Sequence, residues 1–251
     1  MSYVKFEKSD RIGVLTLNRA DKHNSINQDY MRDLEEFLNF AEKEELKALV
    51  VKSAGENVFA AGGDIAYFIT LKSHEDAFKM AFRMHKILNR FEDLRYPTIC
   101  AINGSAIGGG AEIILAFDLR FARSDIYIQF KEKEIGVTTG WGGTYRLVRL
   151  VGYSNALEIL LSADKIDAKK AKDIGLVNEI YDKDILMDKV FEFCYKLKDD
   201  DVKLLKQIKK LTKESALLDR ESAMRLEREL FSASWMFGKR EKQMEKFLNR
   251  G

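Results

Sequence analysis

The sequence predicts a soluble α/β domain followed by a helical appendage, and three observations carry this prediction. Short apolar, β-branched runs alternate with amphipathic helical runs through about the first 180 residues, as in parallel βαβ units. Glycine-rich loops follow two of the short runs. From about Asp184 to the end, the chain has a helical pattern and is heavily charged.

The first part of the chain predicts a hairpin followed by two strand–helix repeats. Two alternating apolar segments flank Ser9-Asp10 and predict an antiparallel hairpin over 3–18. A polar loop breaks this pattern, and apolar residues at helical spacing then predict a helix over 28–45. The run 47–53 predicts a buried parallel strand. The elements expected next are a glycine-rich loop over 54–65, an amphipathic helix over 75–94 and a strand over 96–106 with Pro97 near its start.

The second part continues the alternation and then changes character. An apolar run over 111–118 predicts a short helix buried on nearly all sides, and 119–130 predicts one or two strands. The elements expected after them are a turn and helix over 140–152, two helices over 154–175 and a strand over 176–181. Because the remainder is helical and charged, the predicted organisation is a core over 1–190 and a helical region over 191–251.

Composition limits the class of protein. Of 251 residues, 46% are apolar and 33% are charged, which suits a soluble chain with a sizeable core. The net charge of +2 is too small to favour a nucleic-acid or membrane partner. Cys100 and Cys194 lie in apolar surroundings and are expected to be buried thiols. The N-terminus lacks a signal-peptide pattern, and no apolar stretch reaches the roughly 18 residues that span a bilayer, so we expect a cytoplasmic protein.

Two glycine-rich loops are the first candidates for a functional site. One ends in Ala61-Gly62-Gly63-Asp64, and the other contains the glycine run 108–110. If both loops open helices, they present free backbone N–H groups with a partial positive charge. Two such donors that meet at one oxygen form an oxyanion hole, which stabilises a carbonyl as it becomes an enolate or a tetrahedral adduct. Tight strand-to-helix turns that serve packing alone are the alternative.

The glycine-rich loops do not match other known glycine motifs. Positions 108–113 do not spell G-x-G-x-x-G, and no Gly-Lys-Ser/Thr follows either loop, which argues against dinucleotide and Walker-type phosphate sites. Positions 103–108 do not spell G-x-S-x-G, so a serine hydrolase is not predicted. The three histidines, His23, His74 and His85, lack metal-ligand spacing, and no metal site is expected.

Glu112 is the strongest catalytic candidate from the residues themselves. Its neighbours over 108–117 are glycine or apolar, so its carboxyl is expected to be partly buried at a helix start. Burial raises the pKa of a carboxyl toward the range that is useful for proton transfer. Glu132 and Glu134 form a second acidic cluster, for which a solvated strand end is the simpler explanation when either residue is taken alone.

Five segments in order resemble the enoyl-CoA hydratase/isomerase family, the crotonases, along nearly the whole chain. They are LTLNRADKHNSIN, FAAGGDI, AINGSAIGGGAEIILAFDLRFA, EIGVTTGWGGTYRLVRLVG and AKKAKDIGLVNEIY. The resemblance implies a ClpP/crotonase-like spiral of ββα units whose C-terminal helices form homotrimers, which often pair as a dimer of trimers. It implies CoA-thioester chemistry more firmly than one particular reaction, because the family uses one oxyanion hole for many outcomes.

The resemblance also assigns the catalytic groups. The amides of Gly63 and Gly109 correspond to the two oxyanion donors of the family, and Glu112 corresponds to one glutamate of the hydratase acid/base pair. Counting back four residues from the glycine of E-x-x-x-G gives Glu132 as the second glutamate. Glu134 is the alternative, since related decarboxylases resemble this stretch with an acid at that position.

The resemblance further implies where coenzyme A lies. In the family, the CoA moiety rests on backbone of the first polar loop and of the A-G-x-D loop, and a phenylalanine and a base near the C-terminus reach the CoA phosphate. The corresponding residues are Lys22, His23, Ala61, Asp64, Ile65, Phe247 and Arg250. Lysine is commoner at the position of Arg250, and a solvated terminal charge run is the alternative for the last two. Coenzyme A would be part of the substrate, and no separate cofactor is expected.

Three departures from the family pattern bear on the substrate. Thr139 replaces the proline usual before G-x-G-G, and Trp141 stands at a usually small position within that motif. A bulky indole there would either wall the acyl pocket, selecting short or branched chains, or belong to the core. Lys131 replaces a frequent proline beside Glu132, so Glu134 stays open as the second acid.

These implications favour an enoyl-CoA hydratase that adds water across the 2,3 double bond of a 2-enoyl-CoA. They leave open a crotonase-type decarboxylase of an ethylmalonyl- or methylmalonyl-CoA, toward which GWGGT and Glu134 point, and an enoyl-CoA isomerase. A non-catalytic CoA- or RNA-binding relative is a third alternative because 203–213 is basic, although a solvated helix face explains that segment more simply. The expected partners are an acyl-CoA thioester and further copies of the chain.

Overall fold

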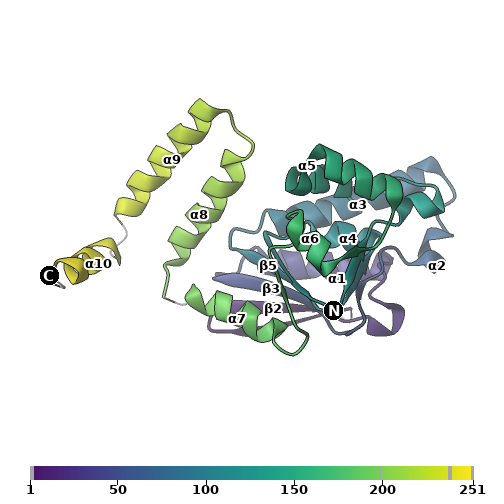
Figure 1. Ribbon diagram of the computed structural model, residues 1–251, viewed down its shortest axis with the longest axis horizontal. Coiled ribbons are helices and arrows are strands. Elements are labelled where there is room, and N and C mark those ends of the chain that lie inside the picture. The colour runs from purple at the N-terminus through teal and green to yellow at the C-terminus, as the bar shows by residue number, and fades with distance from the viewer. Residues whose placement is uncertain (1–2, 198, 237–238, 250–251) are drawn as a thin grey trace.

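Two β-sheets and the helices that cover them form the main body of the computed structural model, which describes residues 3–197, 199–236 and 239–249 (Figure 1). The large sheet has the order β1-β2-β3-β5-β7-β10, and the small sheet has the order β4-β6-β8-β9. The strands of the large sheet are β1 (Val4–Ser9), β2 (Ile12–Leu17), β3 (Ala48–Ser53), β5 (Thr98–Ile102), β7 (Leu119–Arg123) and β10 (Glu179–Tyr181). The strands of the small sheet are β4 (Val58–Ala60), β6 (Ser105–Ile107), β8 (Tyr127–Gln129) and β9 (Ile166–Asp167).

The chain begins with the predicted hairpin. β1 and β2 pair in antiparallel fashion with Ser9 opposite Ile12, so Asp10 and Arg11 form a two-residue turn. Both turn residues have positive φ, 48° and 65°, which matches the twist of the flanking strands. From β2 onward, the neighbouring strands of the large sheet are parallel, as the alternation of strands and helices predicts.

Each of three parallel strands of the large sheet is followed along the chain by a short strand of the small sheet. β3 leads to β4, β5 to β6 and β7 to β8, and helical segments follow each pair, which gives the chain a repeated ββα unit. The single strand expected over 96–106 is therefore two strands in different sheets, with Pro97 before the first, and the loop expected over 54–65 contains β4. The turn between β5 and β6 lies so close to β4 that a Cβ atom on Gly104 would be 2.8 Å from the Phe59 nitrogen.

Helices cover both faces of the large sheet. Leu49 and Val51 of β3 belong to the core that includes α1 and α3, whereas Ala48 and Val50 belong to the core that includes α7. β3 is thus buried on both sides, as its β-branched run predicts. The helical elements of the main body are η1 (Ala20–Lys22), α1 (Gln28–Ala41), α2 (Ile65–Phe68), α3 (His74–Glu92), α4 (Gly109–Ile114), η2 (Glu132–Ile135), α5 (Gly143–Ser162), α6 (Ala168–Asp173) and α7 (Leu186–Lys196).

The helices differ from the predicted ranges at their ends. α1 stops short at Ala41, and α4 covers 109–114 rather than 111–118. Within the range of α5 the backbone of Gly152 is non-helical, with φ 78° and ψ 166°, so two helices meet at a kink there, as the separate helices predicted over 140–152 and from 154 onward require. Gly175, which follows α6, also has φ 78°, as expected of a glycine that terminates a helix.

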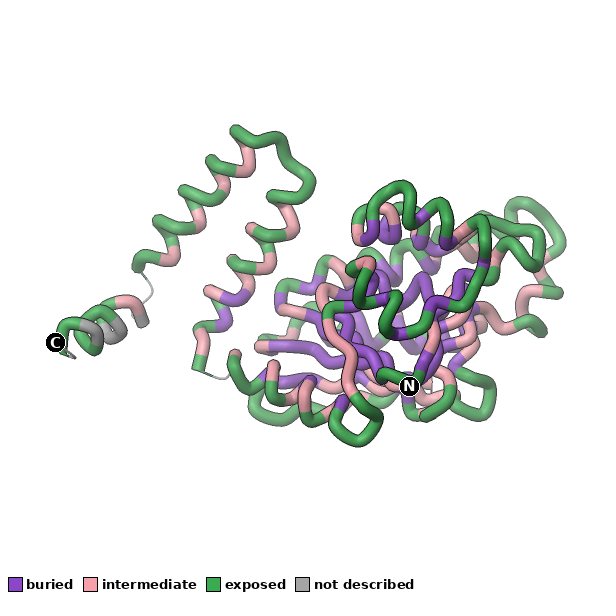
Figure 2. The backbone as a smooth tube through the Cα atoms, viewed as in Figure 1, coloured by how far each residue is buried: buried purple, intermediate pink, exposed green. Residues whose placement is uncertain are grey.

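The C-terminal helices α8 (Val202–Ser215), α9 (Arg220–Trp235) and α10 (Lys239–Leu248) lie to one side of the main body (Figure 1). They are mostly exposed, in contrast with the buried strands of the sheets (Figure 2). The change of character comes after α7 rather than at the predicted boundary of 190. α7 spans that boundary and buries Val190 and Cys194 against the large sheet, so it belongs to the core.

Charged groups join α8 to the core. The Lys209 side chain is 8% exposed, and its Nζ atom lies 2.7 Å from Oδ2 of Asp118 and 3.1 Å from the Tyr96 carbonyl oxygen. Asp118 also accepts hydrogen bonds from the backbone N–H and the hydroxyl of Thr98, at 2.8 Å and 2.9 Å. Burial lowers the pKa of Lys209, and the charge of Asp118 opposes that shift.

Candidate active site

The two glycine-rich loops lie side by side. Gly62 has φ 86°, and a Cβ atom on it would lie 2.7 Å from the Gly109 nitrogen. The first loop is fixed by hydrogen bonds from the Ile26 N–H to the Gly62 oxygen, at 2.7 Å, and from the Asp64 N–H to the Ile26 oxygen, at 2.9 Å. Glycine is required at position 62, since a side chain there would be strained and would meet the second loop.

The amides of Gly63 and Gly109 are free of protein acceptors. Neither N–H donates a hydrogen bond to an acceptor among the residues that the structure describes. Gly109 is the first residue of α4, and Gly63 immediately precedes Asp64, the N-cap of α2. N–H groups at a helix start have no intrahelical partner. The two neighbouring loops can therefore donate hydrogen bonds to an oxygen of a ligand.

Glu112 is buried and is held by the loop that precedes α5. Its Oε2 atom accepts the N–H groups of Trp141 and Gly143, each at 2.8 Å, and its Oε1 atom accepts the Gly140 N–H at 3.1 Å. Burial raises the pKa of Glu112, while the N–H donors and the charge of Arg146 act in the opposite direction. The buried carboxyl at a helix start is therefore where its apolar neighbours predicted it.

Glu132 brings a second carboxyl to the same place. It opens η2, and its Oε1 atom lies 3.8 Å from the position that a Cβ atom on Gly108 would occupy. Both carboxyl oxygens are buried, and neither has a hydrogen-bond partner in the described part of the chain. Burial above all, and also the charge of Glu112, raises the pKa of Glu132 to about 7. Such a carboxyl exchanges a proton near neutral pH.

Glu134, the alternative second acid, is exposed instead. Its carboxylate lies 3.0 Å from the Lys131 Nζ atom and 3.5 Å from the side-chain nitrogen of Gln129. The charge of Glu112 acts on Glu132, whereas Glu134 is paired at the surface. The fold therefore brings Glu132 to the glycine loops.

Aromatic rings cover the two glycines with free amides. A Cβ atom on Gly109 would lie 2.3 Å from Cζ3 of Trp141, and one on Gly63 would lie 2.0 Å from Cζ of Phe68. Trp141 is buried, and its indole N–H donates to the Met80 sulfur at 3.2 Å. Rigid apolar surface therefore lies beside both amides, as expected of a pocket for an acyl chain.

Comparison with known proteins now gives the family. A family model described as enoyl-CoA hydratase/isomerase matches residues 7–251. The chain belongs to this family. A short-chain-enoyl-CoA hydratase from Clostridium acetobutylicum is 31% identical over 251 residues, which cover 100% of this chain and 96% of the relative. The ethylmalonyl-CoA decarboxylase of Homo sapiens is 32% identical over 237 residues, which cover 92% of this chain and 77% of the relative.

The fold agrees with membership of the enoyl-CoA hydratase/isomerase family. The solved structure of an enoyl-CoA hydratase from Thermoplasma volcanium GSS1 matches with a TM-score of 0.89 at 30% identity, covering 98% of this chain and 97% of that one. The crotonase fold expected from the sequence is thereby confirmed. The trimer-forming role of the C-terminal helices stays a prediction.

The residues that the family resemblance assigns to coenzyme A lie on two joined loops. Lys22 ends η1 and His23 follows it, and both are exposed. The His23 carbonyl oxygen accepts the Ala61 N–H at 2.9 Å, which joins the first polar loop to the first glycine loop. The loops expected to hold coenzyme A therefore meet beside the free Gly63 amide.

Asp64 and Ile65 lie where the first glycine loop enters α2. Asp64 caps α2 and pairs with Arg19 at 2.7 Å, so its carboxylate already has protein partners. Burial acts to raise the pKa of Asp64, but Arg19 and the backbone donors outweigh it and hold that pKa below its usual range. Ile65 is 75% exposed, which leaves its apolar side chain open to a ligand.

The C-terminal pair assigned to the CoA phosphate cannot be placed in this site. Phe247 lies in the range of α10, but its side chain is outside the described residues, as is the whole of Arg250. Their assignment to coenzyme A stays a prediction.

Three residues of the site were not singled out from the sequence. Phe68 lies against Gly63, Met80 accepts the indole N–H of Trp141, and Arg146 bonds the loop that holds Glu112. Only Arg146 could have been identified from the sequence, because it is a charged residue in an apolar helical run and precedes Leu147, which is fully buried. A buried arginine is expected to bind fixed acceptors.

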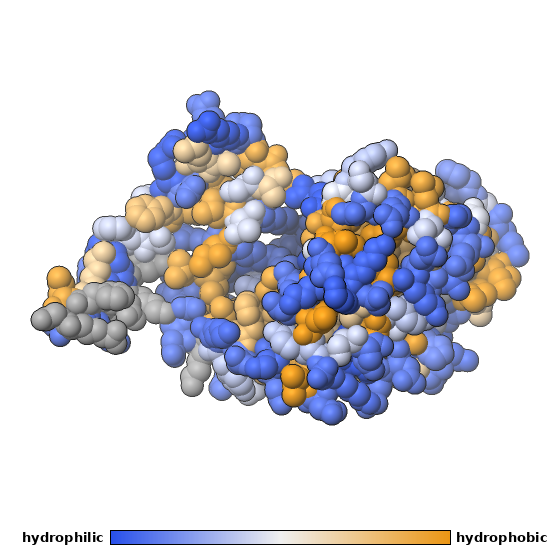
Figure 3. All heavy atoms as spheres, viewed as in Figure 1, coloured by the Kyte–Doolittle hydropathy of each residue, from blue (hydrophilic) through white to orange (hydrophobic). Residues whose placement is uncertain are grey.

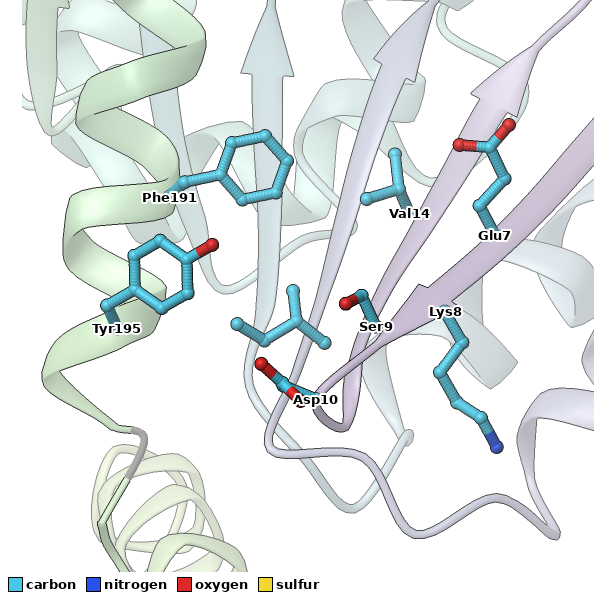
Figure 4. Close-up of a pocket in the computed structure, with 8 residues that line it drawn as sticks. Glu7, Lys8, Ser9, Asp10, Val14, Phe191 and Tyr195 are labelled. Carbon is cyan, nitrogen blue, oxygen red and sulfur yellow. The ribbon is translucent and has the colours of Figure 1, made fainter.

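The rest of the described chain offers no comparable site. A cavity of about 350 Å³ lies between the β1–β2 hairpin and α7, lined by Val14, Phe191 and Tyr195 among others, and it contains no residue of the glycine loops (Figure 4). Within the described ranges, no group of three or more His, Cys, Asp or Glu side chains is placed to hold a metal ion. No helix in those ranges has the length and apolar character needed to cross a bilayer.

Proposed function

We propose that this chain is an enoyl-CoA hydratase that adds water across the 2,3 double bond of a short 2-enoyl-CoA thioester. The observation that carries the proposal is that the carboxyl of Glu132 lies beside the second glycine run and interacts with the carboxyl of Glu112, which is on the helix that this run opens. Relatives of the same family named as short-chain-enoyl-CoA and crotonyl-CoA hydratases, 31% and 30% identical, support it.

The free amides act first in the proposed reaction. The thioester oxygen accepts hydrogen bonds from the Gly63 and Gly109 N–H groups, which draws electrons from the conjugated double bond and makes C3 electrophilic. When a water oxygen bonds to C3, the electron pair of the double bond moves toward C2 and the thioester oxygen. The same amides then stabilise the resulting enolate.

The two glutamates move the protons. Glu112 accepts a proton from water as its oxygen bonds to C3, and Glu132 donates a proton to C2, so that water is added overall; the proton on Glu112 then returns to Glu132, directly or through solvent, and restores the enzyme. Burial raises the pKa of both carboxyls; the N–H donors around Glu112 favour its charged, proton-accepting form, and Glu132, with a pKa of about 7 and no hydrogen-bond partner among the described residues, can carry the proton for C2. Because the two carboxyls interact, they titrate as a pair.

Trp141 limits the space for the acyl chain in this proposal. The indole is buried, lies against Gly109 and is bonded to Met80, so it would bound the space that an acyl chain occupies when its thioester oxygen binds the Gly109 N–H. A fixed wall near the thioester favours short acyl chains over long ones. The reaction requires no cofactor beyond the coenzyme A of the substrate.

Decarboxylation of an ethylmalonyl-CoA is the second candidate function. The 32% identity to the human ethylmalonyl-CoA decarboxylase favours it. Exposure of Glu134 and its pairing with Lys131 argue against it, since that glutamate is the one that pointed to a decarboxylase. An enoyl-CoA isomerase would use the same two carboxyls to move one proton.

A product assay tests the proposal. Purified enzyme is incubated separately with crotonyl-CoA, a 3-enoyl-CoA, ethylmalonyl-CoA and methylmalonyl-CoA, and the products are separated chromatographically. The proposal predicts 3-hydroxybutyryl-CoA as the main product, with Glu112→Gln and Glu132→Gln each lowering kcat by ~100-fold or more. Rapid loss of CO₂ from a malonyl-CoA without hydration of crotonyl-CoA would overturn it in favour of the decarboxylase.

Assembly into a homotrimer or a dimer of trimers is part of the proposal. α9 and α10 expose large apolar side chains, and Figure 3 displays hydrophobic residues gathered on α8 and α9. Contiguous exposed apolar surface in a soluble chain marks an interaction site. A second copy of the chain is the partner that the family resemblance implies, and the small net charge argues against nucleic acid.

A further inference from the structure

One buried arginine holds the loop that in turn holds Glu112. Arg146 lies in the first turn of α5, and its side chain is 5% exposed. Its Nη1 atom donates to the Trp141 carbonyl oxygen at 3.1 Å. Trp141 therefore bonds Arg146 through its carbonyl oxygen and Glu112 through its N–H group.

The same guanidinium group reaches α3. Its Nε atom lies 3.0 Å from Oε2 of Glu92, and its Nη2 atom donates to Oδ1 of Asn89 at 2.6 Å. A guanidinium is planar, with donors in fixed directions, so three different acceptors determine its orientation. Arg146 thus ties the loop 140–143 to a long helix of the core.

The loop is rich in glycine and depends on its contacts with Arg146, with Glu112 and, through the Trp141 indole, with Met80. It consists of Gly140, Trp141, Gly142 and Gly143, and Gly142 has φ 89°. A Cβ atom on Gly142 would lie 2.5 Å from Nη1 of Arg146, so the guanidinium packs directly on the loop backbone. Glycines have high conformational freedom, so a loop rich in them needs external contacts to stay in one conformation.

We propose that Arg146 is a positioning residue, which fixes the 140–143 loop so that its N–H groups hold the Glu112 carboxylate oriented for water activation. This inference rests on the proposed hydratase function. Arg146 acts only through the loop and Glu112 and makes no contact with the substrate in this proposal. Proton transfer requires a positioned carboxylate, since misplacement by about 1 Å can cost ~100-fold in rate.

Charges on several elements face this arrangement. Glu132 on η2 faces Glu112, while Glu92 on α3 faces Arg146, and His85, also on α3, lies beside the loop. The positive charge of Arg146 favours the ionised form of Glu112, whereas burial and the charge of Glu132 favour its protonated form. Removal of that charge should therefore move the ionisation of Glu112 to higher pH.

Arginine variants separate positioning from folding. Hydration of crotonyl-CoA is measured across pH for the wild type, Arg146→Gln, Arg146→Lys and the control Arg83→Gln. Arg83 is suitable because it also joins two helices, with bonds of 2.8 Å and 2.7 Å to Glu35, but lies outside the site. Relative to the wild type, Arg146→Gln should lower kcat by ~10–100-fold and leave KM within about 2-fold. It should also move the acidic limb of the curve of kcat against pH to higher pH.

The conservative variant and a surface variant complete the design. Arg146→Lys should restore the acidic limb, because it keeps the charge, but not kcat, because one ammonium cannot bond all three acceptors. Asn89→Ala removes one of the three acceptors of Arg146. Because Asn89 is exposed, this variant should fold even if Arg146→Gln does not, and its kcat should also fall, by a smaller factor.

Three results decide between the possibilities. If the wild type hydrates crotonyl-CoA but Arg146→Gln and Asn89→Ala match Arg83→Gln, the positioning role is overturned. Full recovery of kcat by Arg146→Lys would also overturn it, since a charge alone would then suffice. If the wild type does not hydrate crotonyl-CoA, the proposed function fails, whatever the arginine variants do.

Discussion

The indole ring of Trp141 covers the backbone of Gly109 so closely that a Cβ atom at position 109 would lie 2.3 Å from Cζ3 of the ring. The ring is buried, and its N–H group is bonded to the Met80 sulfur, which fixes its position. The proposed oxyanion donor and the proposed acyl-pocket wall are thus one packed unit. A change in either residue is expected to affect the other.

Gly109→Ala tests this coupling at the amide. The new methyl group must displace either the indole or the loop, because real Cβ atoms do not approach other atoms at 2.3 Å. We expect kcat for crotonyl-CoA hydration to fall by ~100-fold or more, the loss seen when one oxyanion donor is removed. Gly55→Ala is the control, since a Cβ atom there would meet nothing closer than 3.4 Å. Equal activity of the two variants would contradict the role of the Gly109 amide.

Trp141→Ala tests the acyl-pocket wall. Loss of the indole should raise kcat/KM for octenoyl-CoA relative to crotonyl-CoA by ~10-fold or more, because a few added methylene groups gain space to pack. The cavity should lower the free energy of unfolding by about 3–5 kcal/mol, measured in urea. Trp141→Phe keeps an aromatic wall and should keep most of the preference for short chains. If the wild type and Trp141→Ala prefer the same acyl-chain lengths, Trp141 does not limit the length of the acyl chain.

The sequence predicted the parts of the site that depend on local pattern. The free amides follow from glycines at helix starts, and the burial of Glu112 follows from its apolar neighbours. Contacts of Arg146 with Asn89 and Glu92 join α5 to α3 across more than 50 positions, and no local pattern encodes them. Only packing of the complete fold brings these residues together.

The strand assignments failed where the chain changes sheet within a few residues. Asn103-Gly104 separates the apolar run of β5 from β6, and the single strand predicted over 96–106 passed over this turn signal. The crossing depends on Asn103, whose side chain accepts the Ser53 N–H at 2.8 Å and donates to the carbonyl oxygens of Ser53 and Gly55. A tertiary hydrogen-bond network thus fixes the Asn103-Gly104 turn that ends the first strand.

Glu132 makes both activity and stability depend on pH. Its pKa is about 7 in the folded chain, against 4.5 for an ordinary glutamate. If Glu132 donates the proton to C2, the hydration rate should decline as pH rises through about 7. Glu132→Gln should be slow at every pH and should lack this decline. A decline that persists unchanged in Glu132→Gln would assign the titration to another group.

The raised pKa of Glu132 also makes the free energy of unfolding of the wild type fall, relative to that of Glu132→Gln, as pH rises. The folded chain holds the Glu132 proton more tightly than the unfolded chain, so its contribution to stability is lost as pH rises from about 4.5 to about 7. Glu132→Gln lacks this loss. Its free energy of unfolding should therefore exceed that of the wild type by an amount that grows by roughly 2 kcal/mol over this range, after a discount for partial exposure. Urea unfolding at pH 4.5 and pH 8 measures the change, and a difference independent of pH would contradict it.

Lys209→Ala should loosen the C-terminal helices from the core. The substitution leaves Asp118 without its cation, which should cost about 2 kcal/mol in stability because that carboxylate is partly exposed and keeps its bonds to Thr98. Limited proteolysis should cleave the link between α7 and α8 faster than in the wild type. Lys210→Ala is the control, since Lys210 is exposed on the same helix. Identical cleavage of both variants would show that the ion pair does not anchor α8.

Phe231→Glu tests assembly through the C-terminal helices. Phe231 is 61% exposed on α9, lies tilted against Trp235 with ring centroids 5.3 Å apart, and lines a groove with Ile208 of α8. A buried, unpaired charge in an interface is strongly unfavourable, so the variant should sediment as a monomer while the wild type sediments as a trimer or hexamer. Ser232→Glu adds the same charge at an exposed neighbour outside the groove and should keep the wild-type state. A monomeric wild type, or a Phe231→Glu variant that still forms the full oligomer, would mean that this groove is not the interface.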